Sequence, residues 1–465
     1  MAAPTYDTLI LGAGLAALTA ARSLTHHRIA ILEARDRVGG RAYTSTDTPR
    51  PIDLGCSMIH GFREGNPAAK LITEELGMDV HIAEGAKGLV YGADGPLSEA
   101  EATSLFATSA QNAFSPPLSA PIDASIASIL VPKLEDPRLV ALARTAEIGA
   151  GATLEEQSAK YSGFEQGFGG TDAWPAGGYG GEVIRNLLAD VKAAGGEVHL
   201  DSEVISIEDL GTKEGVKVTT KGGKQYTAKT VISTIPHAVL REAPPTFTPS
   251  LSHQFTSAIQ RMRTGALEKI VLSYPSAWWP SPPQNGSFLL LPVTPSSSSS
   301  DKPSNLRDLF SRTVIPVTSF QRMAHPAHPT LLAYIGADAA RHLSTFPTSE
   351  ITSAFHAYLV ERLASSSSDS PPEPSVALVT DWLKDPFSRG ATSTPIVLQK
   401  DADGDPNTPL DFFLVSRSTW EGRLGWAGEH TVIDNHGSVA GAVISGKREG
   451  ERVRELLQRL VENQA

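Results

Sequence analysis

The stretch Thr5-Tyr-Asp-Thr-Leu-Ile-Leu-Gly-Ala-Gly-Leu-Ala-Ala17 decides the fold of this chain. Residues 6–11 have the composition of a short buried strand of the parallel type, and they run directly into an alanine-rich helix over 15–24. A second apolar strand follows over 28–32. Strand, turn, helix and strand in this order predict a dinucleotide-binding β-α-β unit.

The turn of this unit carries the glycine pattern that such binding requires. Gly12 permits the tight turn, and Gly14 lets backbone N–H groups approach a pyrophosphate at the helix N-terminus. Ala17 is small enough for close packing of strand and helix. Glu33, at the end of the second strand, is placed to accept hydrogen bonds from a ribose.

The next residues, Glu33-Ala-Arg-Asp-Arg-Val-Gly-Gly-Arg41, add a second loop of phosphate donors that an NAD dehydrogenase does not need. This stretch resembles the flavin amine oxidase family, which carries E-A-x-x-x-x-G-G-R after its first β-α-β unit. The resemblance implies FAD as the cofactor, with Arg41 near the pyrophosphate. The cofactor-binding residues predicted from this part of the chain are Gly12, Gly14, Leu15, Ala16, Glu33, Ala34, Arg35, Gly39, Gly40 and Arg41.

Composition narrows the class of protein. The 465 residues suffice for two or three structural units, and the formal charge of −11, from 51 acids and 40 bases, argues against nucleic acid as a partner. One cysteine, Cys56, excludes an internal disulfide and suits a reducing compartment. The chain shows no charged leader and no apolar run of the roughly 18 residues that a membrane span needs. We therefore expect a cytosolic monomer or homodimer that binds neither nucleic acid nor membrane.

The stretch Ile52-Asp-Leu-Gly-Cys-Ser-Met-Ile-His-Gly61 resembles the family's D-L-G-A-x-W-I-H-G, which passes the flavin ring. The resemblance places Met58 and Ile59 at the cofactor, although Met58 replaces the family's aromatic residue. Taken alone, His60 reads as a turn or core histidine. Polyamine oxidases share this I-H-G, so the resemblance favours His60 as a catalytic and substrate-contacting residue.

Lys269 lies in Gly265-Ala-Leu-Glu-Lys-Ile-Val-Leu-Ser-Tyr274, an apolar strand followed by a Trp-Trp-Pro segment. An isolated lysine is usually a solvated surface charge. The stretch resembles the family's G-x-l-x-K-I-x-L-x-F, whose lysine reaches a water bonded to flavin N5. The resemblance therefore predicts Lys269 as the main catalytic residue.

The C-terminal quarter carries three further resemblances. Asp381-Trp-Leu-Lys-Asp-Pro-Phe-Ser-Arg-Gly-Ala-Thr-Ser393 is similar to the family's loop under the flavin, in which monoamine oxidases bond a cysteine to the cofactor. Ala391 stands at that place here, so we expect non-covalent FAD. Leu424-Gly-Trp-Ala-Gly-Glu-His-Thr431 and the segment from Gly437 to Glu449 are similar to the family's A-G-E-h-T and to its last helix, which begins at the flavin.

These motifs complete the predicted site. With Trp174-Pro-Ala-Gly-Gly178 and the strand at Val204, which are similar to further family segments, the resemblance implies Val204, Trp382, Gly428, Glu429, Ser438 and Val439 as cofactor-binding residues, and His60, Trp174, Phe387, Thr392 and Ser438 as substrate residues. Thr392 replaces an aromatic residue of the family, and Ser438 stands where monoamine oxidases place a tyrosine. We expect no metal.

The resemblance predicts an α/β (α+β) fold. A discontinuous Rossmann-like FAD-binding domain would comprise residues 1–85, 173–248 and 376–465, with a mixed α/β substrate-binding domain of residues 86–172 and 249–375 inserted in it. Helical spacing from about 98 to 163 predicts the helical part of the inserted domain.

Three functions are open at this point. The first is a polyamine or N-acetylpolyamine oxidase that transfers hydride from the carbon of a C–N bond to flavin N5, with O2 as acceptor and H2O2, an aldehyde and an amine as products. The second is an oxidase of another amine or of an amino acid, although Ser57-Met-Ile59 offers no arginine for a carboxylate. The third is a non-enzymatic relative of the Rab GDP-dissociation-inhibitor type. Gly428, Glu429 and Lys269 favour an enzyme.

Overall fold

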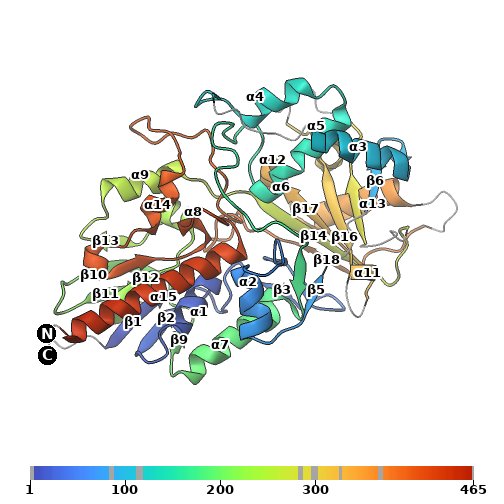
Figure 1. The fold of residues 1–465 in the computed structure, drawn as a ribbon. Coiled ribbons are helices and arrows are strands. Elements are labelled where there is room, and N and C mark those ends of the chain that lie inside the picture. The colour runs from blue at the N-terminus through green and yellow to red at the C-terminus, as the bar shows by residue number, and fades with distance from the viewer. Residues whose placement is uncertain are drawn as a thin grey trace.

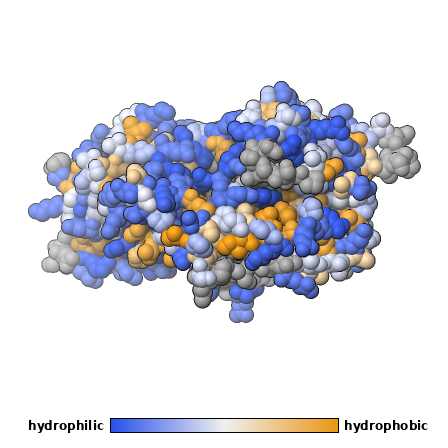
Figure 2. Space-filling model, turned by 90° about the horizontal axis from the view of Figure 1, so that it is seen from above, coloured by the Kyte–Doolittle hydropathy of each residue, from blue (hydrophilic) through white to orange (hydrophobic). Residues whose placement is uncertain are grey.

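The computed structural model describes residues 5–82, 88–111, 119–280, 286–294, 302–323, 327–364 and 370–462. Two sheets, each covered by helices, lie side by side, and both described ends of the chain lie beside the first sheet (Figure 1). Figure 2 shows hydrophilic residues over most of one face, with apolar residues in smaller patches between them. Within the described residues, no helix is long and apolar enough to cross a membrane.

The first sheet has eight strands in the order β13-β10-β11-β12-β1-β2-β9, with β19 also paired to β12. The pairs β1–β2, β1–β12, β2–β9 and β12–β19 are parallel, whereas β11 pairs antiparallel with both β10 and β12. The bounds are β1 (Tyr6–Leu11), β2 (Ile29–Leu32), β9 (Glu197–His199), β10 (Val204–Asp209), β11 (Val216–Thr220), β12 (Gln225–Ser233), β13 (Thr246–Thr248) and β19 (Leu424–Trp426).

Apolar side chains of β1 alternate between two cores because successive residues of a strand point to opposite faces. Ile10 packs in the core with helices α1 (Leu15–Arg22), α7 (Ile184–Ala193) and α15 (Val439–Glu462). Leu9 and Leu11 pack in the core with α9 (His253–Arg261) and α14 (Leu410–Ser416). This sheet with helices on both faces is the Rossmann-like architecture that the sequence predicts.

Two glycines let α15 approach α1 closely. A Cβ atom on Gly446 would lie 2.4 Å from the carbonyl oxygen of Ala16, and one on Gly450 would lie 2.7 Å from that of Ala20. Because these are backbone oxygens, a larger residue would push the helices apart. The close crossing fixes the N-terminal end of α15 beside the β1–α1 turn.

The second sheet has the order β18-β14-β17-β16-β15-β6-β7 and is antiparallel except for the β15–β6 pair. Its strands are β6 (Leu89–Gly92), β7 (Gly95–Pro96), β14 (Leu267–Ser273), β15 (Ser287–Leu290), β16 (Ile315–Ser319), β17 (Thr330–Gly336) and β18 (Val376–Val379). Its core includes residues of α10 (Leu306–Arg312), α12 (Ala337–Leu343) and α13 (Thr348–Leu363), and α11 (Phe320–Met323) contacts β17.

Short elements complete the chain. Two-stranded sheets are formed by β3 (Thr44–Ser45) with β4 (Ile52–Asp53) and by β5 (Val80–Ile82) with β8 (Ala173–Pro175). The π-helical turn Leu71–Glu75 extends α2 (Pro67–Lys70). A second π-helical turn, Gly178–Val183, directly precedes α7. The remaining short turns are 3-10 helices at Val131–Lys133, Trp420–Gly422 and Glu429–Thr431. Another short helix is α8 (His237–Glu242).

The region predicted to be helical from 98 to 163 is helical only in part. It contains α3 (Glu99–Gln111), α4 (Ile126–Leu130), α5 (Pro137–Arg144) and α6 (Ala146–Ala150), but residues 151–163 form no helix. Gly151 ends α6 in a left-handed conformation with φ of 64°, and Gly265 packs against it at a distance too short for a side chain. The predicted domain limits remain a prediction. Two elements near these limits contact the sheet of the neighbouring predicted domain. Helix α9, from the predicted substrate-binding domain, packs on the first sheet, and β18, from the predicted FAD-binding domain, pairs with β14 of the second sheet.

Candidate active site

A cavity of about 400 Å³ lies at the carboxyl ends of β1 and β2 and reaches β14 and β17 of the second sheet. Ligands of open α/β sheets bind at this end of the strands. The predicted cofactor residues that line the cavity come from both ends of the chain and are Gly12, Gly14, Leu15, Ala16, Glu33, Ala34, Arg35, Gly39, Gly40, Arg41, Met58, Val204, Trp382, Gly428, Glu429, Ser438 and Val439. The predicted residues Lys269, His60, Phe387 and Thr392 line it as well.

Two predicted site residues lie outside this lining. Ile59 is buried, bonds through its backbone to Ala173, and lines a smaller neighbouring cavity. Trp174 lies in β8, with its ring centroid 6.3 Å from that of His81, and it lines neither cavity. In the ladder of β8 with β5, Trp174 is the partner of His81.

The β1–α1 turn has the form that a phosphate group requires. Gly12 has φ of 97°, and a Cβ atom there would lie 2.6 Å from Thr234 Oγ1. Among the described residues, no side chain caps the start of α1, and its first turn holds no acid. The free N–H groups at this helix start are therefore available to an anion.

Glu33 is almost fully buried at the end of β2. Its Oε2 accepts a hydrogen bond from the backbone N–H of Ala13 at 2.7 Å, and its Oε1 accepts one from that of Arg35 at 2.9 Å. A carboxylate oxygen can accept two hydrogen bonds, so both oxygens keep capacity for a ribose.

Arg389 was not predicted as a site residue, yet it lines the cavity. Its Nη1 bonds to Glu242 at 3.1 Å, whereas its buried Nε has no partner among the described residues. An unpaired buried donor is costly, and a polar ligand in the cavity would satisfy it. Together with the uncapped α1, this group fits a phosphate-bearing cofactor.

Arg41 and Glu429 join the two ends of the chain. Arg41 Nη1 donates to Glu429 Oε1 at 2.7 Å and to the carbonyl oxygen of Ala391 at 2.6 Å. The Ser393 hydroxyl also donates to Glu429. Burial alone would raise the pKa of Glu429, but Arg41, His430 and the Ser393 hydrogen bond lower it to about 2.

We expect Glu429→Gln to destabilise the apoprotein by about 3 kcal/mol at pH 7, because the charged carboxylate is favoured in the folded state. A folded-state pKa below the unfolded value adds stability above the unfolded pKa, near 4.5, and this stability is lost as the pH falls toward 2. Urea unfolding from pH 7 to pH 3 should therefore show the difference between wild type and variant shrinking as the pH falls. The exposed Glu64→Gln is the control, and a difference that does not depend on pH would contradict this account.

Lys269 is 5% exposed, and its position in β14 turns the side chain into the cavity. Its Nζ donates to the carbonyl oxygens of Asp53 at 2.8 Å and of Gly55 at 2.6 Å, and it lies 3.5 Å from Ser57 Oγ. Burial lowers the pKa of Lys269 to about 8, although Asp53 and Cys56 oppose the shift. The amine is thus fixed by backbone acceptors and titrates close to neutral pH.

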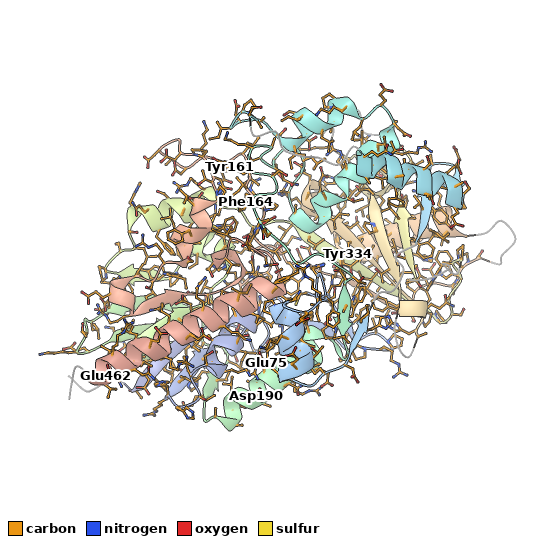
Figure 3. All side chains as sticks on the ribbon, in the orientation of Figure 1. Glu75, Tyr161, Phe164, Asp190, Tyr334 and Glu462 are labelled. Atoms are coloured by element: carbon orange, nitrogen blue, oxygen red, sulfur yellow. The ribbon has the colours of Figure 1, made fainter. Side chains whose placement is uncertain are left out.

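Tyr334 is a cavity residue that the sequence did not predict (Figure 3). It pairs with Lys269 across the β14–β17 ladder, and Lys269 Nζ lies 5.4 Å from the centre of its ring. A cation over an aromatic face is attracted by the ring. The register of two strands far apart in sequence creates this contact, so no local pattern signals it.

His60 lies at the border of the large and small cavities. Its side chain is 63% exposed, and its Nδ1 lies 3.1 Å from Asp172 Oδ2. Asp172 also accepts a hydrogen bond from the backbone N–H of Gly61 at 3.0 Å. The acid therefore orients the imidazole, and the structure does not bury His60 in a core.

Ser438 caps α15 at the cavity wall. Its hydroxyl donates to the carbonyl oxygen of Asn435 at 2.6 Å and accepts from the N–H of Gly441 at 3.1 Å. The helix begins at Val439, which also lines the cavity. The positive end of the helix dipole is thus directed at the cavity, where it stabilises negative charge.

Comparison with known proteins agrees with this geometry. A sequence model described as flavin containing amine oxidoreductase matches residues 148–454, and one described as an NAD(P)-binding Rossmann-like domain matches residues 10–75. The chain is 25% identical to the probable polyamine oxidase 4 of Arabidopsis thaliana, over 95% of this chain and 85% of that protein. It is 26% identical to the lysine-specific histone demethylase 1 homolog 3 of A. thaliana over 97% of this chain. It is 27% identical to the lysine-specific histone demethylase 2 of Homo sapiens over 96% of this chain. This chain spans only 30% and 53% of those two demethylases.

The chain belongs to the flavin-containing amine oxidoreductase family. Its cofactor is FAD, which the Rossmann-like unit and the family both support. This family consists of flavin-dependent oxidoreductases.

Proposed function

We propose that this protein oxidises the C–N bond of an aliphatic polyamine or N-acetylpolyamine, giving an aldehyde, an amine and H2O2. The observation that carries the proposal is the imidazole of His60, oriented by Asp172 at the border of the cavity. Ser438 lines the cavity at the position where monoamine oxidases place a tyrosine. The similarity to a probable polyamine oxidase over most of both chains supports the same substrate class.

FAD, when bound, accepts a hydride from the carbon beside the amine nitrogen and passes two electrons to O2. The substrate becomes an imine, which takes up one water and separates into aldehyde and amine. Hydride leaves more readily when the nitrogen is uncharged. The buried, cationic Lys269 disfavours a second positive charge nearby and so favours the neutral form of the reacting amine.

We further propose that FAD is held without a covalent bond. Ala391 lines the cavity in the loop where a cysteine would make that bond. Cys56 also lines the cavity, but burial raises the pKa of its thiol to about 12. A neutral thiol is a poor nucleophile.

Peroxide release from a panel of amines tests the proposed substrate. We expect H2O2 from spermine, spermidine or N1-acetylspermine and little from benzylamine. A peptide with dimethylated lysine belongs in the panel, because the demethylases are also relatives. Peroxide from that peptide alone would replace the polyamine proposal with a methyl-lysine substrate.

A further inference from the structure

A second cavity, of about 170 Å³, adjoins the large one and shares Met58, His60, Ser438 and Val439 with it. A substrate whose reacting amine lies in the large cavity could extend across this border. No lysine or arginine occurs among the described residues that line the second cavity.

Glu165 provides the carboxylate of this cavity. Its Oε2 contacts Nδ1 of His436, and 31% of its side chain is exposed. Burial raises the pKa of Glu165, and nearby Asp434 raises it further, while His436 opposes them. An additional cation beside Glu165 would therefore stabilise its charged form.

The segment that carries Glu165 is held in place rather than free. The backbone N–H of Gln166 donates to Asp434 Oδ1 at 2.9 Å, and that of Phe168 donates to Asn435 Oδ1 at 3.2 Å. The neighbouring Phe164, labelled in Figure 3, stacks on the His436 ring with centroids 6.0 Å apart. These contacts preorganise the carboxylate before a ligand arrives.

The rest of the lining is mixed, with polar side chains of Asn66, Asn435, His436 and Ser438 beside apolar ones. The apolar residues of the second cavity are Met58, Ile59, Ala68, Phe168, Val439 and Ala440. A second negative charge stands at the border, where Asp172 holds His60. Apolar side chains in the same cavity as a carboxylate match methylene groups that end in an ammonium group.

We propose that the second cavity is a recognition site for a second ammonium group of the substrate, with Glu165 as its counter-ion. This inference rests on the proposed function and adds how one end of a polyamine is recognised. It predicts that Glu165 strengthens the binding of substrates with two positive charges and leaves the binding of monoamines unaffected.

The variant Glu165→Gln tests the inference, with Glu165→Asp as the conservative variant and the exposed Glu64→Gln as the control. Calorimetric titration of the FAD-loaded proteins, reduced beforehand with dithionite and kept free of oxygen, gives the Kd for spermidine and for benzylamine, and steady-state oxidation gives kcat and KM for spermidine. We expect Glu165→Gln to raise the Kd and KM for spermidine about tenfold to a hundredfold, the range for a lost charge-assisted hydrogen bond. Its kcat for spermidine and its Kd for benzylamine should stay unchanged, Glu165→Asp should recover part of the affinity, and Glu64→Gln should behave as wild type.

The results separate this inference from the proposed function. If Glu165→Gln and wild type oxidise spermidine with the same Kd and KM, the inference is wrong and the proposed polyamine oxidase activity is unaffected. If wild type binds spermidine without oxidising it and Glu165→Gln binds it more weakly, the cation site is supported and the proposed reaction is wrong. Equal weakening for spermidine and benzylamine would show a merely structural role of Glu165 and overturn the inference.

Discussion

Replacing Lys269 by methionine is expected to slow the reduction of bound FAD by spermidine about a hundredfold to a thousandfold, the effect of removing one preorganised donor from an active site. Lys269 lines the cavity, and the carbonyl oxygens of Asp53 and Gly55 fix its amine. Methionine keeps the length and apolar stem of the side chain but loses the charge and the donors. The rate is measured as bleaching of the flavin absorbance after rapid anaerobic mixing.

The stability of the same variant separates catalysis from folding. Burial lowers the pKa of Lys269 to about 8, so keeping the charge in the folded protein is costly at pH 7. Methionine removes this cost but leaves two carbonyl oxygens without their donor. The free energy of unfolding of the apoprotein should therefore change by no more than about 2 kcal/mol. A rate of flavin reduction within about threefold of wild type would contradict the role of Lys269.

Gly12→Val is expected to give a protein without yellow colour, because two effects combine at this position. Gly12 has φ of 97°, which strains any residue with a side chain, and its Cβ would lie 2.6 Å from Thr234 Oγ1. The Thr234 hydroxyl donates to the carbonyl oxygen of Leu11 at 2.8 Å, so it is not free to move. The added side chain would also project beside the turn where the pyrophosphate is expected. The ratio of the visible flavin absorbance to the protein absorbance of the purified protein reports the bound flavin.

Gly65→Val is the matched control for backbone strain. Gly65 has φ of 86°, but no atom lies within 4 Å of its added Cβ. Both valines thus carry a similar strain, whereas only Gly12→Val blocks the turn. Circular dichroism establishes that both variants are folded. A folded Gly12→Val protein with the flavin content of wild type would show that this turn does not bind the cofactor.

The parts of the fold that follow local patterns could be predicted from the sequence. β1 has the predicted bounds, Tyr6–Leu11, because its apolar run and glycine turn leave few alternatives. Helix α15 begins at Val439, where the small hydroxyl residue Ser438 provides a cap. The region 151–163 was predicted wrongly, because glycine and close backbone packing at Gly265 end the helix despite the apolar spacing.

The parts that depend on long-range register could not be predicted. Tyr334 reaches Lys269 only because β17 pairs with β14 at that register, and Glu429 meets Arg41 across 388 residues of chain. Most residues recognised by resemblance line the cavity, but Ile59 and Trp174 do not. Glu165 stood in a glycine-rich segment without any motif, and its meeting with His436 is visible only in three dimensions.

The most direct test of the central proposal is the visible spectrum of the purified protein, mixed without oxygen with spermine, spermidine, N1-acetylspermine and benzylamine. The account predicts a yellow protein whose flavin absorbance is bleached rapidly by at least one polyamine and not by benzylamine. Admission of O2 should then restore the colour with formation of H2O2. A protein that stays yellow with all three polyamines would contradict the proposed activity.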